Sequence, residues 1–130
     1  MNHILLITHG QLGKVFLEVA EAMLSRPLEV QALSFMDLQD ADAFAKEVEN
    51  QMQSYPKEDC ILILTDLFGG TPSNLAIPYL EKDRIEVITG LNLGMIMHLL
   101  SQEEEKSFAQ LCLCAKKAGS DAVIQAGAFL

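Results

Sequence analysis

The feature that most constrains the fold of this chain is an alternation of short apolar runs with longer segments of helical periodicity. Four apolar runs predict strands, at residues 4–8, 28–35, 60–65 and 85–89. Five segments with apolar residues at helical spacing predict helices, at residues 12–24, 41–52, 73–80, 93–100 and 108–117. Alternation of this kind is typical of α/β proteins. We therefore expect an open three-layer α/β/α fold, with one domain spanning residues 1–130.

The composition of the strands predicts their order in the sheet. Residues 4–7 and 61–64 are apolar at every position, as is typical of strands that are covered on both faces. The second and fourth strands contain or adjoin charged residues, such as Glu29 and Glu86, which is expected of flanking strands. Right-handed crossovers then give a parallel sheet of order 2-1-3-4. The winding reverses between strands one and three, and open α/β sheets bind ligands at the carboxyl ends of the strands at such a point.

Chemically distinctive residues follow both strands at this switch point. Thr8-His9-Gly10 ends the first strand, and Asp66 ends the third. Gly69, Gly70 and Thr71 then lead into a helix, with Thr71 as the expected N-cap, and such a loop favours phosphate through free N–H groups and the helix dipole. A carboxylate can hold one ring nitrogen of a histidine and leave the other as a nucleophile. The sequence therefore predicts phosphoryl transfer to and from His9.

Charge and cysteine usage exclude several other classes of function. The net charge of −9, with Arg26 and Arg84 as the only arginines, argues against nucleic-acid binding. Cys112 and Cys114 are expected to point to different faces of a helix, and no metal site or cofactor is expected. The sequence shows neither a long apolar segment nor a secretory signal, so we expect a cytoplasmic protein.

The two motifs resemble those of enzyme IIA of the mannose family, a component of the bacterial phosphoenolpyruvate-dependent sugar phosphotransferase system. The first motif of this family, THG, corresponds to residues 8–10. The second, D-x-x-GG-[ST]-P-x-N, corresponds to residues 66–74. The resemblance extends over essentially the whole chain and includes the stretch VITGLNLGM at residues 87–95.

The resemblance implies a role for each of these residues. His9 would accept a phosphoryl group from the phosphocarrier protein HPr and pass it to enzyme IIB, which serves membrane permease subunits. Asp66 would orient His9, Thr71 and the backbone amides of Gly69 and Gly70 would hold phosphate oxygens, and Phe68 would contribute to partner docking. Such a protein would be cytoplasmic, and a peripheral association with the membrane transporter is compatible with its role.

The resemblance also implies a homodimer, because members of the family pair a C-terminal strand with the sheet of the partner subunit. Residues 121–125 form a short strand-like segment, and residues 122–125 match that exchanged antiparallel strand. One position departs from the family pattern, since relatives usually carry proline where this chain has Gly94. Glycine relaxes a backbone that proline would fix, which affects the expected rigidity of this loop.

Three alternatives stay open at this point. The phosphocarrier subunit of phosphoenolpyruvate-dependent dihydroxyacetone kinase has a similar domain and the same kind of histidine. A histidine phosphatase would need several arginines around its phosphate, whereas Thr8 stands where the RHG signature of that class has arginine. A receiver or flavodoxin-like module is a third class, but receivers need an acidic pair after the first strand. The sequence specifies neither the sugar nor whether enzyme IIB is a separate protein.

Overall fold

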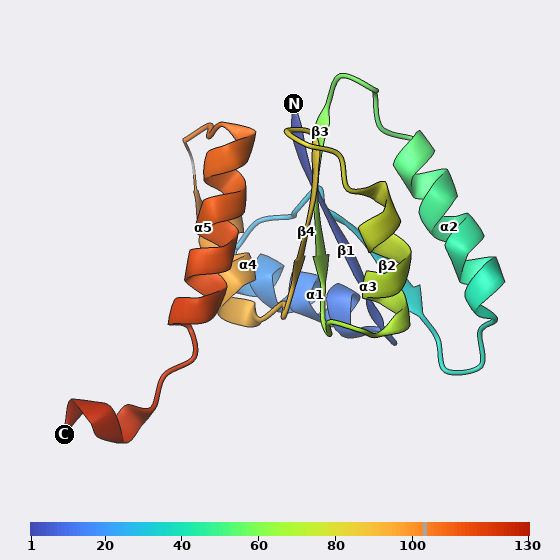
Figure 1. The fold of residues 1–130 in the computed structure, drawn as a ribbon. Helices are drawn as coiled ribbons and strands as arrows, with labels where there is room; N and C mark the ends of the chain where they lie inside the picture. The colour runs from blue at the N-terminus through green and yellow to red at the C-terminus, as the bar shows by residue number, and fades with distance from the viewer. Residues whose placement is uncertain (103) are drawn as a thin grey trace.

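Four parallel strands form a central sheet in the computed structural model, which describes residues 1–102 and 104–130 (Figure 1). The strands are β1 (Asn2–His9), β2 (Gln31–Phe35), β3 (Cys60–Thr65) and β4 (Ile85–Thr89). Their order is β2-β1-β3-β4, with every neighbouring pair parallel. The strand order expected from right-handed crossovers is therefore confirmed.

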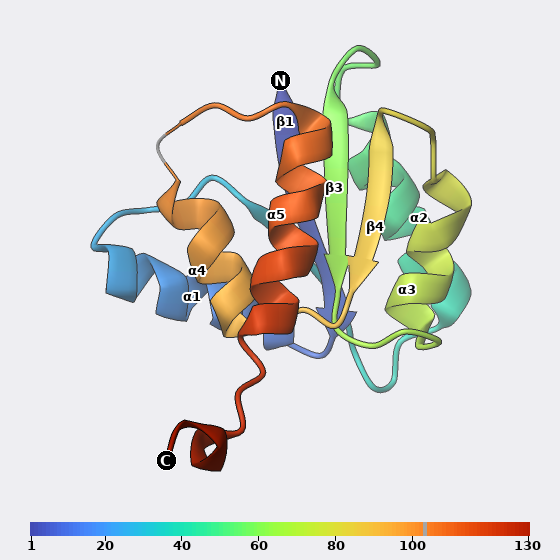
Figure 2. The ribbon, with the colours of Figure 1, turned by 60° about the vertical axis from the view of Figure 1, so that its left-hand side comes forward.

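Helices cover both faces of this sheet, as Figures 1 and 2 show. One face carries α1 (Leu12–Leu24), α4 (Leu93–Ser101) and α5 (Phe108–Asp121). The other carries α2 (Ala41–Gln53) and α3 (Thr71–Ala76), which continues into the 3₁₀ helix η1 (Ile77–Tyr79). The three-layer α/β/α architecture predicted from the sequence is confirmed.

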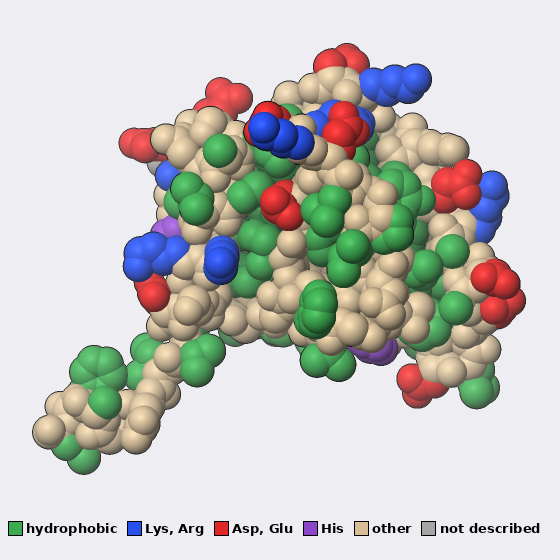
Figure 3. All heavy atoms as spheres, viewed as in Figure 1, with side chains coloured by type: hydrophobic (Ala, Val, Ile, Leu, Met, Phe, Trp, Pro, Cys, Tyr) green, Lys and Arg blue, Asp and Glu red, His purple; other side chains and the backbone are tan. Residues whose placement is uncertain are grey.

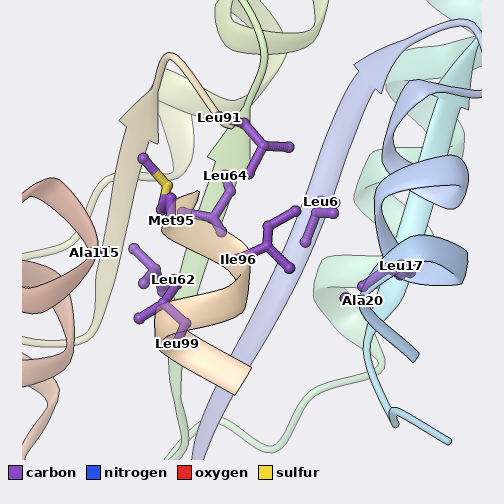
Figure 4. Packing of buried hydrophobic residues seen from close by; sticks show 10 residues of the cluster. All are labelled: Leu6, Leu17, Ala20, Leu62, Leu64, Leu91, Met95, Ile96, Leu99 and Ala115. Atoms are coloured by element: carbon purple, nitrogen blue, oxygen red, sulfur yellow. The ribbon is translucent and has the colours of Figure 1, made fainter. Parts of the chain in front are cut away.

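The period of two along the central strands divides the core into two halves. Leu6, Leu62 and Leu64 face α1, α4 and α5, where they pack with Ile96 and Leu99 of α4 (Figure 4). The residues that alternate with them face the opposite helices, with a cluster that includes Leu5, Ile7, Ile61, Ile63, Phe44 and Val48. Successive strand residues point to opposite faces, so a strand that is apolar at every position serves both halves.

Several element boundaries differ from those predicted. Strand β2 begins at Gln31 instead of Leu28, because its pairing with β1 begins where Gln31 lies opposite Leu5. Helix α3 begins at Thr71 and turns into η1 at Ile77, and Gly70 occupies the N-cap position that was expected for Thr71. Pro78 has no backbone N–H, so a regular α-helix to Leu80 is disfavoured there.

The apolar residues of α1 divide between the core and the surface. Phe16 packs against the core, whereas Leu12, Val15, Val19 and Met23 are exposed. The buried side of α1 is formed by Gly13, Leu17 and Ala20. Glycine and alanine let the helix lie close to the sheet, which rotates the larger apolar residues toward solvent.

The chain ends in an arm, residues 122–130, that projects away from the body of the molecule (Figure 1). Helix α5 extends to Asp121, and the arm contains the 3₁₀ helix η2 (Ala126–Phe129). Residues 123–125 form no strand within the single chain, so the exchanged strand remains a prediction. Throughout the described ranges, no helix is both long enough and apolar enough to cross a membrane.

Candidate functional site

The carboxyl ends of β1 and β3 bring together two residues that lie 57 positions apart in the sequence. The two strands are neighbours in register, with Ile7 opposite Thr65, so the residues just after them share one edge of the sheet. His9 is the last residue of β1, and Asp66 follows β3 directly. The juxtaposition that the strand order implied is therefore present in the structure.

Two hydrogen bonds connect His9 to the same carboxylate oxygen of Asp66. The backbone N–H of His9 donates to Asp66 Oδ2 at 3.1 Å, and the ring nitrogen Nδ1 lies 3.0 Å from that oxygen. The Asp66 side chain is only 11% exposed, whereas that of His9 is 42% exposed. Asp66 Oδ1 is buried and accepts no hydrogen bond from any described residue. Among the described residues, His9 is therefore the hydrogen-bond partner of the Asp66 side chain.

This geometry determines which ring nitrogen is available for chemistry. An ionised carboxylate only accepts hydrogen bonds, so Nδ1 must carry the proton that it shares with Asp66. A neutral imidazole with Nδ1 protonated has an unprotonated lone pair on Nε2. The arrangement therefore leaves Nε2 unprotonated on a side chain that solvent can reach.

The glycine hairpin, a loop of residues 67–70 between β3 and α3, lies against the Cε1 and Nε2 edge of the same ring. A Cβ atom placed on Gly70 would be 2.5 Å from His9 Cε1 and 3.0 Å from Nε2, which is closer than van der Waals contact permits. Its neighbour Gly69 has φ +87°, in the left-handed region that glycine adopts readily. Glycine at both positions thus lets the backbone approach the imidazole closely.

The backbone amides of this hairpin already have acceptors within the protein. The Gly69 N–H donates to Ser73 Oγ at 3.0 Å, and the Gly70 N–H donates to the Leu67 carbonyl at 3.2 Å. Neither the N–H nor the hydroxyl of Thr71 is hydrogen-bonded to another described residue. Of the three residues predicted to bind phosphate, Thr71 is the one whose donors are unengaged in this structure.

Two phenylalanines differ in their relation to His9. Phe68 is 74% exposed and forms part of the hairpin, next to the exposed Leu67. Phe35 ends β2 opposite His9, and its ring meets the imidazole edge-on with 6.3 Å between the centroids. Sequence reasoning overlooked Phe35, although its place at the end of a strand neighbouring β1 could have indicated it. Hydrophobic side chains at this rim of the molecule are visible in Figure 3.

A hydrogen bond to the side chain of Thr8 holds the turn that follows His9. The Thr8 hydroxyl is fully buried and accepts a hydrogen bond of 2.8 Å from the Gly13 N–H. Gly10 has φ +52°, and its N–H donates to the Phe35 carbonyl at 2.8 Å. The residues on both sides of His9 are thus anchored, which holds the backbone that carries the imidazole.

A second histidine–carboxylate pair lies at the opposite end of the sheet. His3 Nε2 is 2.8 Å from Asp59 Oδ2, and the amino group of Met1 contacts the other oxygen at 3.3 Å. The hydrogen bond from His3 holds the pKa of the Asp59 carboxyl below its usual value. The His3 ring also packs on Tyr55, with 4.6 Å between the ring centroids, and no glycine hairpin adjoins it. This pair differs from that of His9 in the ring nitrogen that contacts the carboxylate, Nε2 instead of Nδ1, and in its surroundings.

The arginines lie away from His9, which disfavours phosphatase chemistry. Arg84 precedes β4, at the amino ends of the strands, and pairs with Glu81 at 2.8 Å. Arg26 follows α1 and donates to the Leu100 carbonyl. Among residues 1–102 and 104–130, no group of three or more His, Cys, Asp or Glu side chains is arranged to hold a metal ion.

Residues 3–114 match the model of the family EIIA-man, described as PTS system fructose IIA component. The chain is 28% identical over 118 residues to the PTS system mannose-specific EIIAB component of Escherichia coli (strain K12). That alignment covers 89% of this chain and 36% of the relative, so the chain spans about a third of that protein's length.

Two further relatives match most of both chains. The PTS system fructose-specific EIIA component of Bacillus subtilis (strain 168) is 24% identical over 112 residues, which cover 85% of this chain and 77% of the relative. The crystal structure of phosphotransferase system component EIIA from Streptococcus agalactiae superposes with a TM-score of 0.83 at 24% identity. It covers 98% of this chain and 99% of that chain, which shows that the two share the fold.

Proposed function

The chain belongs to the EIIA-man family of phosphotransferase system IIA components, and from this premise we propose that it carries phosphoryl groups on His9. The proposed donor is the phosphocarrier protein HPr, and the proposed acceptor is enzyme IIB. Enzyme IIB and its membrane permease then act together to phosphorylate a sugar. The observation that supports this best is the 3.0 Å contact between His9 Nδ1 and Asp66 Oδ2, which leaves Nε2 as the free nucleophile.

The proposed reaction exchanges one P–N bond for another. The lone pair of His9 Nε2 attacks the phosphorus atom of the phosphohistidine in HPr. The P–N bond of the donor breaks, and its electron pair returns to the donor imidazole. The phosphorylated His9 ring then carries P on Nε2, a proton on Nδ1 and a positive charge, which the Asp66 carboxylate stabilises. Transfer to enzyme IIB follows the same steps with this chain as the donor.

We assign the bound phosphoryl group to the hairpin side of the site. A phosphoryl group adds close to two negative charges at neutral pH, which N–H and hydroxyl donors can steady. The unengaged N–H and hydroxyl of Thr71 are the first candidates, and the amides of Gly69 and Gly70 would join them by sharing or exchanging their present acceptors. No arginine is needed for a carrier that does not hydrolyse its phosphate.

The exposed position of His9 supports a carrier that meets two protein partners. We propose that Phe68, which is 74% exposed beside the site, packs against these partners. We also propose that residues 1–130 act as one IIA unit in the cytoplasm, and that two chains associate through residues 122–125. The match to a PTS IIA family favours this role over the dihydroxyacetone kinase subunit.

Phosphorylation in a reconstituted system tests the proposal. The purified chain, incubated with enzyme I, HPr and radiolabelled phosphoenolpyruvate, is expected to gain one acid-labile phosphate. His9→Gln should abolish this labelling, whereas His98→Gln, on the exposed side of α4, should label like the wild type. Equal labelling of His9→Gln and wild type would contradict the proposal. In the same assay Phe68→Ser should raise KM for HPr, and Leu113→Ser, an exposed leucine of α5, should leave it unchanged.

A further inference from the structure

We propose that Ser73 is a positioning residue for His9, because its hydroxyl fastens the glycine hairpin that lies against the imidazole ring. This inference rests on the proposed function, since it assigns to Ser73 the alignment of the nucleophilic Nε2 atom. Ser73 itself neither carries phosphate nor contacts the ring in this assignment. It acts through the backbone of Gly69 and Gly70.

The Ser73 hydroxyl connects the start of α3 to both glycines of the hairpin. The side chain is completely buried. Its Oγ accepts a hydrogen bond of 3.0 Å from the Gly69 N–H and donates one of 3.2 Å to the Gly70 carbonyl. Donation to a carbonyl three residues earlier is common for serine in helices. Acceptance from Gly69, which lies before the helix, is the bond that reaches out to the loop.

The two hydrogen bonds of Ser73 are not helix caps. The N-cap position of α3 is Gly70, and no side chain caps the helix there. Asn74 supports the hairpin from the exposed side, where its Nδ2 donates to the Gly69 carbonyl at 3.3 Å. Gly69 at φ +87° is a conformation that loop contacts must hold in place, because glycine is free to leave it. The hydrogen bond from the Gly69 N–H to the buried Ser73 hydroxyl is a contact that holds Gly69 in this conformation.

The hairpin and Asp66 hold the imidazole from two sides. Asp66 fixes Nδ1 by a hydrogen bond, while Gly70 lies against the Cε1 and Nε2 edge so closely that a Cβ there would be 2.5 Å from Cε1. A shift of Gly70 therefore changes the space around Nε2 and the position of the donors of Thr71. Ser73 controls this shift, so its loss should slow the chemical step even with a donor too small to contact Phe68.

A serine-to-alanine comparison tests this assignment. Ser73→Ala removes both hydrogen bonds, and Ser34→Ala is the matched control, because the Ser34 hydroxyl is buried without a hydrogen-bond partner among the described residues. The first measurement is the NMR signal of the His9 Cε1–H in the unphosphorylated proteins, which requires no phosphotransfer. The second is the rate of His9 phosphorylation at varied HPr concentrations and with phosphoramidate as a small donor.

We expect Ser73→Ala to shift the His9 Cε1–H signal and to accelerate hydrogen exchange of the Gly69 amide. The maximal phosphorylation rate should fall about tenfold with both donors. Ser34→Ala should match the wild type in all of these measurements. If Ser73→Ala is unfolded at the assay temperature, Ser73→Cys, which is similar in size but a weak hydrogen-bonding group, replaces it with the same expectation.

Two results would overturn the assignment of Ser73. One is an unchanged His9 Cε1–H signal in the folded Ser73 variant, and the other is a maximal rate equal to that of the wild type. Failure of the proposed function is a different result, namely that neither donor phosphorylates His9 in the wild type. The NMR comparison then still decides whether Ser73 positions the ring.

Discussion

At the scale of residues, the site consists of one histidine held between a carboxylate and a glycine. The sequence was sufficient to predict the pairing of His9 with Asp66, because both residues end strands that had to be neighbours in the sheet. It could not predict the contact with Gly70, since a glycine in a loop has many permitted conformations. The hydrogen bonds of Ser73 to Gly69 and Gly70 could not be predicted either, because they depend on the same loop conformation. Phe35 could have been indicated by its place at the end of a strand next to β1.

Gly70→Ala should impair phosphorylation through steric contact alone. Gly70 has φ −79° and ψ 167°, which alanine adopts without strain, so the new Cβ and its 2.5 Å approach to His9 Cε1 are the only disturbance. We expect phosphorylation at least about tenfold slower, corresponding to about 1.4 kcal/mol in the barrier. Gly127→Ala is the control, because a Cβ at that position meets no atom within 4 Å. Equal single-turnover rates in the two variants would show that the ring does not depend on this contact.

At the scale of elements, the strands followed the prediction more closely than the helix ends. Strands β3 and β4 and helix α1 have the predicted bounds. An uninterrupted apolar run defines β3, and a long periodic segment defines α1. Helix α5 continues past Lys117 to Asp121, through Gly119. The missing side chain of Gly119 admits Met95 of α4, as a Cβ there would be 2.5 Å from Met95 Cε. Contacts between helices thus extended an element that local sequence would have ended.

The packing of α5 also predicts an unreactive thiol. Burial, assisted by the charge of Glu86, raises the pKa of the Cys112 thiol to about 11. The thiolate is the reactive form, and its fraction below the pKa increases tenfold per pH unit. In a Cys60→Ser/Cys114→Ser variant, alkylation of Cys112 by iodoacetamide should therefore keep accelerating beyond pH 10.

The same variant unfolded in guanidinium provides the control, because a free thiol has a pKa of about 8.5 and its alkylation rate should level off near pH 9. The pH at which the rate levels off is the relevant quantity, since burial also slows the reaction by restricting access. A plateau near pH 9 in the folded protein would contradict the raised pKa of Cys112.

At the scale of the whole molecule, the sheet order could be derived from the sequence, but the direction of the C-terminal arm could not. The order follows from handedness and from which strands are wholly apolar. The arm has exposed apolar side chains, with Val123 82% and Phe129 78% exposed, and residues 122–130 include no charged residue. Exposed apolar residues of this kind often mark an interface. A second copy of the chain is the partner that the family resemblance implies.

Removal of residues 123–130 should therefore change the association of the protein. We expect the full chain to sediment with the mass of two chains and the truncated chain with the mass of one. Phosphoramidate should label His9 equally in both, because the site lies within a single chain. Leu113→Ser, an exposed apolar residue outside the arm, should leave the mass at two chains. A full chain that sediments as a monomer at micromolar concentration would contradict the proposed dimer.

The contact between Gly94 and Ala122 has a consequence for comparisons between relatives. Gly94 lies in the first turn of α4, and a Cβ on it would be 2.5 Å from the Cβ of Ala122, where the arm begins. A chain with proline at this place, as the family pattern usually has, must route its last residues along a different path. The path of the C-terminal arm therefore depends on the residues at positions 94 and 122 together. A change at one of these positions without a matching change at the other should alter the direction of the arm.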